Sequence, residues 1–128
     1  MTIIDEYFVL QEKYEKKYGE KTIVLMECGQ FFEIYGIKND VEKKGRIYEI
    51  ADITNLSVSK RGGDKTKQSC RKNPLMAGFP NHSYEKWKDI LLKHNYTIIK
   101  IEQDSHGTKD PSRKITEIIS PGVNIETN

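Results

Sequence analysis

Apolar and polar residues recur along the chain with two different periods, and these periods predict its secondary structure. Over the first twenty residues, apolar and aromatic side chains return every three or four positions, which is typical of a helix with one buried face. Thr2 is placed to cap this helix, with Asp5 three residues further on, and Gly19 is a typical stop. The stripe consists of Ile3/Ile4, Tyr7/Phe8, Gln11, Tyr14 and Tyr18.

Shorter runs rich in β-branched and aromatic residues predict strands. A second helix is predicted from Ser83 to about His94-Asn95, because Tyr84, Trp87, Ile90 and Leu91 share one face. The predicted strands are residues 22–28, 31–35, 56–59, 75–79, 96–101 and 114–119, the last of them stopped by Ser120-Pro121-Gly122. The intervening residues 60–73 and 105–113 are expected to be loops.

Residues 39–53 are harder to assign from their pattern. Their charges have helical spacing at the start, and Ile47, Ile50 and Ala51 follow, so we favour a helix. The elements then alternate between one helix and two strands. This order predicts an α/β (α+β) fold, with a mixed β-sheet of about six strands surrounded by about three helices.

The stretch GQFFEIYG, residues 29–36, joins two of the predicted strands. Gly29-Gln30 fits a two-residue turn with glycine in its first central position. Side chains alternate between the faces of a strand, so Phe31 and Glu33 share one face and Phe32 enters the core. One interpretation is that Phe31 covers a small apolar patch while Glu33 is solvated, because single exposed aromatic residues are common.

A functional interpretation requires a ligand with flat groups and a hydrogen-bonding edge, and a nucleobase has both. Stacking a base on an aromatic ring stabilises a complex by on the order of 1–3 kcal/mol. Unstacking an intact base step costs about a few kcal/mol, and bending the duplex adds roughly 1–6 kcal/mol. Phe31 would therefore enter as a wedge where a base is already mispaired or unpaired.

Glu33 would sharpen that discrimination. Its carboxylate is repelled by phosphates, which weakens binding to ordinary duplex. The repulsion is tolerable where the carboxylate accepts a hydrogen bond from a base edge or itself takes up a proton.

Composition limits the other classes of function. The 128 residues, 36% apolar and 31% charged, suit one folded domain with a net charge of +2, which does not by itself indicate nucleic-acid binding. With two cysteines, a disulfide framework is not expected, and an intracellular setting fits better. No apolar run approaches the length of a membrane span, so no membrane partner is predicted.

A local basic cluster changes that picture. It has a charge of +5, which could neutralise phosphates, although a solvated loop is an equally simple interpretation. Asp64 is the acid within it, and its cations are Lys60, Arg61, Lys65, Lys67, Arg71 and Lys72.

Two other functions stay open at this point. Scattered acids such as Asp40 and Glu42 could serve a small metal-dependent nuclease, although no metal or catalytic site is predicted and no Walker-type motif is present. Alternatively, Phe31 could be a stacking platform for single-stranded nucleic acid.

Five stretches, in order, resemble the amino-terminal mismatch-recognition domain of the MutS family of DNA mismatch-repair proteins. These stretches are GQFFE, LSVSKRG, MAGFPNH, YTIIKIEQ and RKITEIISPGV, and the resemblance covers nearly the whole chain. The chain departs from the family pattern at Gln30, Phe32 and Leu75, and in the lysine-rich loop after Arg61. The resemblance therefore indicates a divergent branch.

The resemblance implies a mixed sheet surrounded by helices, with a helix near residues 41–52. It implies that Phe31 stacks on the mispaired base and that Glu33 hydrogen-bonds it. Residues near the DNA backbone or minor groove are expected at Arg61, Met76, Gln103 and Arg113, and Lys60 joins them from the basic cluster.

The resemblance also bears on the larger protein. We expect residues 1–122 to form the recognition domain and residues 123–128 to begin a linker to a downstream domain. The partner expected is double-stranded DNA with mismatches or small loops. This domain is expected to be non-enzymatic and to hold no cofactor. ATP with magnesium, and the homodimer contacts, are expected in downstream portions.

Overall fold

A computed structural model describes residues 2–62, 68–104 and 112–127, with side chains described as far as residue 122. Within these ranges the chain forms a sheet of eight strands with three α-helices and one short 3-10 helix. The helices are α1 (Ile3–Tyr18), α2 (Ile47–Thr54), η1 (Asn81–Ser83) and α3 (Tyr84–Lys93). The strands are β1 (Thr22–Cys28), β2 (Phe31–Lys38), β3 (Lys43–Lys44), β4 (Ser59–Lys60), β5 (Leu75–Pro80), β6 (Thr97–Gln103), β7 (Arg113–Ser120) and β8 (Val123–Thr127).

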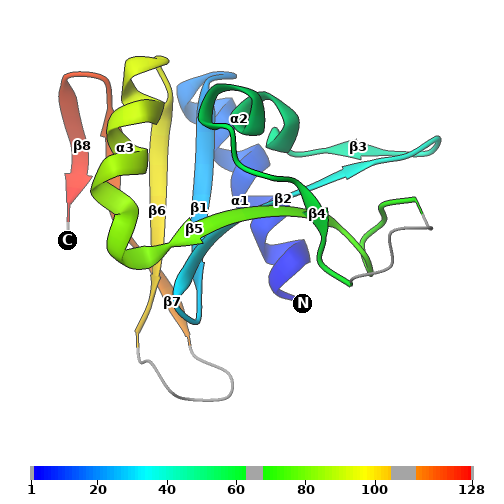
Figure 1. Cartoon of the computed structure of the whole chain (residues 1–128). Coiled ribbons are helices and arrows are strands. Elements are labelled where there is room, and N and C mark those ends of the chain that lie inside the picture. Colours follow the sequence, from blue (N-terminus) through cyan, green and yellow to red (C-terminus); the bar gives the residue numbers. More distant parts are fainter. Residues whose placement is uncertain (1, 63–67, 105–111, 128) are drawn as a thin grey trace.

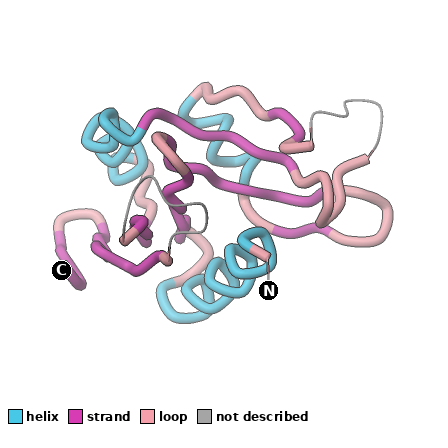
Figure 2. The backbone as a smooth tube through the Cα atoms, turned by 90° about the horizontal axis from the view of Figure 1, so that it is seen from below, coloured by secondary structure: helices cyan, strands magenta, loops and turns pink. Residues whose placement is uncertain are grey.

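The sheet has the strand order β4-β5-β2-β1-β6-β7-β8, and β3 pairs with the outer end of β2. β1 runs parallel to β6 and antiparallel to β2, so the sheet is mixed. Helix α1 covers one face, while α2 and α3 lie on the other (Figures 1 and 2). The predicted fold class is therefore confirmed.

Helix α1 begins and ends where its sequence predicts. The Thr2 hydroxyl accepts a hydrogen bond from the backbone N–H of Asp5 at 3.2 Å, which satisfies one free amide of the first turn. Gly19, with φ of 104°, ends the helix and donates its N–H to the carbonyl of Glu15. The stripe faces the sheet, where Tyr7 donates its hydroxyl to the carbonyl of Val24 at 3.0 Å.

Strands β1 and β2 form the predicted hairpin. Gly29 has φ of 60°, a left-handed conformation that a residue with a Cβ adopts rarely, and this allows the two-residue turn. β1 is buried from Thr22 to Glu27 because β2 and β6 flank it and helices cover both faces. The hairpin therefore rises from the centre of the sheet, not from an edge.

The helix predicted across residues 39–53 is wrong in its first half. Lys43–Lys44 pairs with β2 as the short strand β3, and α2 begins at Ile47. The cause is local: the Asn39 side chain accepts hydrogen bonds from the N–H groups of Val41 and Glu42 and closes a turn. A helix over the whole of residues 41–52, which the family resemblance implies, is wrong for the same reason.

Two strand predictions also need correction. The strand expected at residues 56–59 is displaced to Ser59–Lys60, where it pairs with Leu75 and Met76. The strand ending at Ser120 is not the last, because Val123–Thr127 turns back and pairs with it as β8. The proposed linker from residue 123 stays a prediction, although the sheet includes residues 123–127.

Candidate nucleic-acid interface

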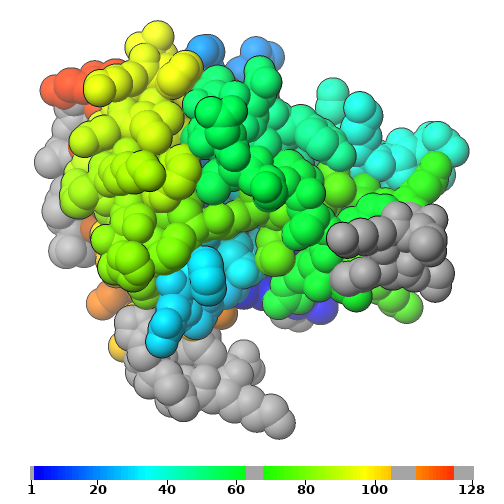
Figure 3. Space-filling model, viewed as in Figure 1, coloured from blue at the N-terminus to red at the C-terminus, as the bar shows by residue number. Residues whose placement is uncertain are grey.

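The hairpin tip separates two adjacent phenylalanines. Phe31 is 48% exposed, whereas Phe32 is 2% exposed and packs against the rings of Phe79 and Tyr84. The tip reaches the surface at the lower edge of the molecule, beside the end of β5 (Figure 3). The prediction that Phe32 enters the core while Phe31 lies on the other face is confirmed.

Strand pairing places Phe31, Glu33 and Tyr35 on the face of the sheet that α1 covers. Directly opposite residues in antiparallel strands share a face, and here Phe31 pairs with Cys28 and Tyr35 with Met76. Tyr35 is fully buried and its ring meets that of Tyr7 edge-on, 5.1 Å between centroids. The face thus runs from a covered aromatic contact under α1 to an exposed ring at the tip.

The Glu33 carboxylate is held from within the protein. The Tyr35 hydroxyl donates a hydrogen bond to Glu33 Oε1, and the Cys28 sulfur lies 3.3 Å from the same hydroxyl. Burial raises the pKa of Tyr35 well above its ordinary value, and the neighbouring Cys28 and Glu33 add to the effect. Burial likewise raises the pKa of the Cys28 thiol. Both groups therefore keep their protons at neutral pH and can act as donors.

The turn itself is held by contacts from distant parts of the chain. The Gln103 side chain accepts from the Gly29 N–H and donates to the Gly29 carbonyl, each at 3.1 Å. Asn81 donates its backbone N–H to the Gln30 carbonyl at 2.8 Å. The polar backbone of an exposed turn is thus satisfied by protein groups, which fixes its position.

Glu27 supports this turn indirectly, by holding the two residues that contact it. It is 2% exposed, and its carboxylate accepts from the backbone N–H of Gln103 at 2.9 Å and from the Asn81 side chain at 3.0 Å. The Glu27 carbonyl accepts from Arg113 Nε at 2.8 Å. A buried carboxylate is tolerated because hydrogen bonds replace its hydration. We call Glu27, Asn81 and Gln103 the turn clasp.

Gln103 and Arg113, which were predicted to contact DNA, therefore also hold the hairpin. Arg113 lies beside the last residues of β1, next to the turn, with Nη2 3.7 Å from the Cys28 sulfur. Their contacts with DNA stay a prediction.

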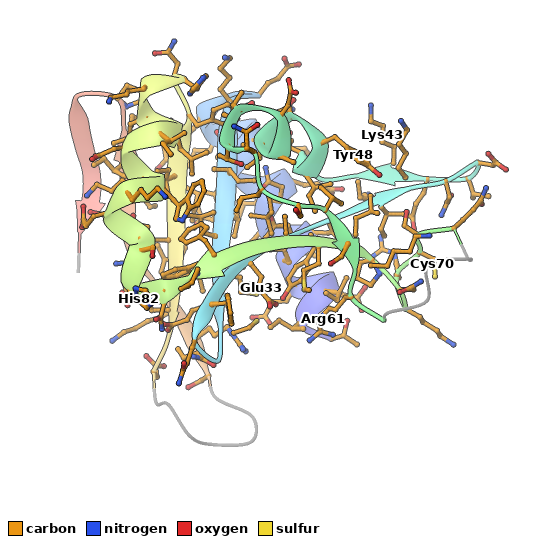
Figure 4. All side chains as sticks on the ribbon, in the orientation of Figure 1. Glu33, Lys43, Tyr48, Arg61, Cys70 and His82 are labelled. Carbon is orange, nitrogen blue, oxygen red and sulfur yellow. The ribbon has the colours of Figure 1, made fainter. Side chains whose placement is uncertain are left out.

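Two further predicted residues lie on the Phe31 face. Met76 is opposite Tyr35, and the Arg61 guanidinium lies over the Tyr35 ring, 5.9 Å from its centroid. Figure 4 shows Glu33 and Arg61 in the same lower part of the molecule. Lys60 pairs with Leu75, the neighbour of Met76 in β5. Since adjacent residues of a strand point to opposite faces, the register places Lys60 on the face opposite Phe31.

The basic cluster is divided by its contacts. Lys65 and Lys67, with Asp64, lie outside the described residues. Arg71 is paired with Asp5 at 2.8 Å and Glu42 at 3.6 Å, so its charge is partly neutralised. Lys72 is exposed.

The acids considered for a nuclease are engaged elsewhere. Asp40 accepts a hydrogen bond from Gln68 at 3.4 Å, and Glu42 pairs with Arg71. Among the described residues, no three His, Cys, Asp or Glu side chains form a group that could hold a metal ion.

A cavity of about 500 Å³ lies between α1, β3 and α2. Its charges largely pair with one another, since Arg46 contacts Glu15 at 2.6 Å and Glu49 at 3.1 Å. Lys43 and Tyr48 mark this region in Figure 4, well away from Glu33. The cavity is thus a separate feature from the hairpin tip.

Sequence reasoning missed the turn clasp and the role of Tyr35. One signal was present, because Glu27 is an acid inside the otherwise apolar run TIVLMEC. A charged residue in a buried strand requires partners, which here come from residues 54 and 76 positions away.

Comparison with known proteins decides the family. The family model of MutS domain I matches residues 4–128. The chain belongs to the MutS domain I family. A DNA mismatch repair mutS homologue of Acanthamoeba polyphaga mimivirus is 32% identical over 124 residues, covering 95% of this chain and 11% of that protein. The DNA mismatch repair protein MutS of Bacteroides fragilis is 29% identical over 109 residues, covering 83% of this chain and 11% of that protein.

A mitochondrial DNA mismatch repair mutS homologue of Sarcophyton glaucum is 25% identical over 137 residues, covering 94% of this chain and 14% of that protein. The chain thus spans about a tenth of the length of the MutS relatives it matches. None of the helices in the described ranges has the length and apolar character needed to cross a bilayer.

Proposed function

We propose that this chain recognises mismatches in DNA on behalf of a mismatch-repair protein. Its ligand is double-stranded DNA that contains mispaired bases or small unpaired loops. Phe31 enters the minor groove as a wedge and stacks on the loosened base, while Glu33 hydrogen-bonds that base. The domain acts by binding and performs no chemistry.

The observation that carries this proposal is the pair Phe31 and Phe32. Phe32 is anchored in the core, and Phe31 stands exposed at a turn that the protein holds on both sides. A ring carried on a fixed backbone loses less conformational freedom when it binds, so more of the stacking energy is retained. Membership of the MutS domain I family supports the same assignment.

The wedge favours damaged pairing for an energetic reason. Stacking contributes on the order of 1–3 kcal/mol, which is comparable to the few kcal/mol that unstacking an intact step costs. A mispaired base has already lost part of its pairing and stacking, so the same ring enters it with a net gain. We assign Arg61 and Arg113 to the DNA backbone beside it, and the exposure of Arg61 on the Phe31 face supports this assignment.

The proposal also extends to a full-length protein that carries this domain. Since this chain covers only 11–14% of the relatives' length, we assign ATP and magnesium to portions of such a protein beyond this domain. Homodimer formation is assigned to those portions as well.

Replacing Phe31 by alanine tests the proposal. In the full-length protein that carries this domain, Phe31→Ala should reduce the ratio of mismatch to homoduplex affinity to near one, measured by fluorescence anisotropy. The matched control is Val9→Ala, which removes another exposed apolar side chain, 53% exposed on α1, and should leave the ratio unchanged. An unchanged ratio in Phe31→Ala would refute the wedge.

Two further measurements on labelled DNA test the alternatives, which are a metal-dependent nuclease and a single-strand binder. Adding Mg²⁺ or Mn²⁺ to labelled DNA tests for a nuclease, and cleavage that needs the metal would contradict our proposal. Tighter binding to single strands than to mismatched duplex would instead indicate a stacking platform.

A further inference from the structure

We propose that Tyr35 is the positioning residue for Glu33, and that its hydroxyl fixes the direction from which the carboxylate meets a base beside Phe31. This inference rests on the proposed function and assigns a role to a residue that never touches DNA. Tyr35 is buried, and it acts only through the side chain two positions before it.

The contacts form a chain of three polar groups. Tyr35 gives its single hydroxyl proton to Glu33 Oε1, so in the 3.3 Å contact between Tyr35 and Cys28 the thiol is the group with a proton to donate. Burial keeps the thiol protonated, as its raised pKa indicates. Donors in series polarise one another, which strengthens the bond that reaches Glu33.

Packing restricts the Tyr35 ring. The residue is fully buried, its ring meets that of Tyr7 edge-on at 5.1 Å, and the Arg61 guanidinium lies over it at 5.9 Å. Gly78 lies directly opposite Glu33, and a Cβ built there would come within 3.4 Å of Glu33 Cγ. The glutamate stem therefore lies against a strand with no side chain in its way, and its end is held by a fixed hydroxyl.

This arrangement leaves acceptor capacity on the carboxylate for a ligand. Glu33 Oε1 accepts from the Tyr35 hydroxyl, and the Glu33 side chain is only partly buried. A carboxylate has room for about four hydrogen bonds, so the Tyr35 bond does not exhaust it. A base donor can use the remaining capacity, while phosphates of an ordinary duplex meet a charge that cannot swing aside.

Removal of the hydroxyl should loosen Glu33 without removing it. In the full-length protein, Tyr35→Phe should lower the ratio of mismatch to homoduplex affinity by about tenfold or more, as expected for the loss of one hydrogen bond to a charged group. The loss should come partly from tighter homoduplex binding, because a mobile carboxylate can avoid the phosphates. A matched control is Tyr7→Phe, which removes another buried tyrosine hydroxyl and should leave the ratio unchanged.

A double-mutant cycle distinguishes positioning from a general structural effect. In a Glu33→Ala background, Tyr35→Phe should have no further effect on the ratio. An equal loss in that background, or the same loss in Tyr7→Phe, would overturn the inference. If Phe31→Ala abolishes discrimination while Tyr35→Phe leaves it intact, the inference fails and the proposed function stands. If Phe31→Ala has no effect, both fail.

If the Tyr35→Phe variant does not fold, the contact can be tested by ¹⁹F NMR with the tyrosine retained. With 3-fluorotyrosine at position 35, the ¹⁹F resonance should move when Glu33 becomes alanine, and again when mismatched duplex is added. A resonance that does not respond to Glu33→Ala would refute the contact itself.

Discussion

At the scale of single residues, the hairpin shows how alternation gives two identical side chains opposite roles. Phe31 and Phe32 are neighbours in sequence, yet one is exposed and the other is packed between Phe79 and Tyr84. A one-residue slip in strand register would exchange them. The register is set by the positive φ of Gly29 and the two-residue turn.

The two phenylalanines should therefore differ sharply in their contribution to stability. Phe32→Ala should lower the free energy of unfolding by about 3–5 kcal/mol, because it opens a cavity in the core. Phe31→Ala should change it by less than about 0.5 kcal/mol, as expected for an exposed position. Urea denaturation of both variants measures the difference. Similar losses in the two would mean that Phe31 packs against the protein.

Glu33 carries a separate prediction on binding. Glu33→Ala should raise the affinity for homoduplex, because it removes a negative charge that faces the phosphates. Titration of the variant with matched duplex at two salt concentrations checks this, and the difference from the unaltered protein should shrink at high salt. Weaker homoduplex binding would contradict a penalising role for the carboxylate.

At the scale of elements, the hairpin depends on groups that come from β6 and η1. The turn clasp joins Glu27 to Gln103 and Asn81, and Gln103 in turn holds Gly29. An isolated two-stranded hairpin is marginal in water. Here the tip is instead supported by the central strands and by a buried carboxylate.

Glu27→Gln tests the clasp with little change in shape. The NH2 group of the glutamine is a donor, and it would face one of the two N–H donors that the carboxylate oxygens accept from. We therefore expect a loss of about 1–3 kcal/mol in unfolding free energy. Hydrogen exchange at the Gly29 and Gln103 amides should become faster. Glu20→Gln, at an exposed position before β1, is the control and should have no such effect. Unchanged exchange at both amides would show that the clasp does not hold the turn.

Sequence patterns predicted the elements that depend on local signals. Helix α1 with its Thr2 cap, the hairpin and the second clear helix follow from period and turn chemistry. The patterns failed at residues 39–46, where the Asn39 turn overrides helical charge spacing. They could not reveal the turn clasp, because the parallel pairing of β1 with β6 brings in Gln103 and the pairing of β5 with β2 brings in Asn81.

At the scale of the whole molecule, charge is distributed unevenly in spite of a net value of +2. The α1, β3 and α2 region pairs its cations internally, as Arg46 does with Glu15 and Glu49. Arg61 is exposed on the Phe31 face, over Tyr35. The side of the molecule that carries the wedge thus also offers a cation for a phosphate.

Arg61 and Arg71 should differ in the salt dependence of DNA binding. Arg61→Ala should reduce the slope of log K against log salt by about one, as expected for one phosphate contact. Arg71→Ala should leave the slope nearly unchanged, because its guanidinium is paired with Asp5 and Glu42. Equal slopes for the two variants would mean that ion pairing within the domain does not decide which arginine meets DNA.

The central position of β1 has a consequence for biosynthesis. Its two neighbours are β2, which follows immediately, and β6, where Thr97 lies opposite Thr22. A nascent chain that has emerged from the ribosome only as far as α3 therefore lacks the strand that completes the far side of the hairpin. The support that Gln103 gives to Gly29 therefore becomes available only after β6 has emerged.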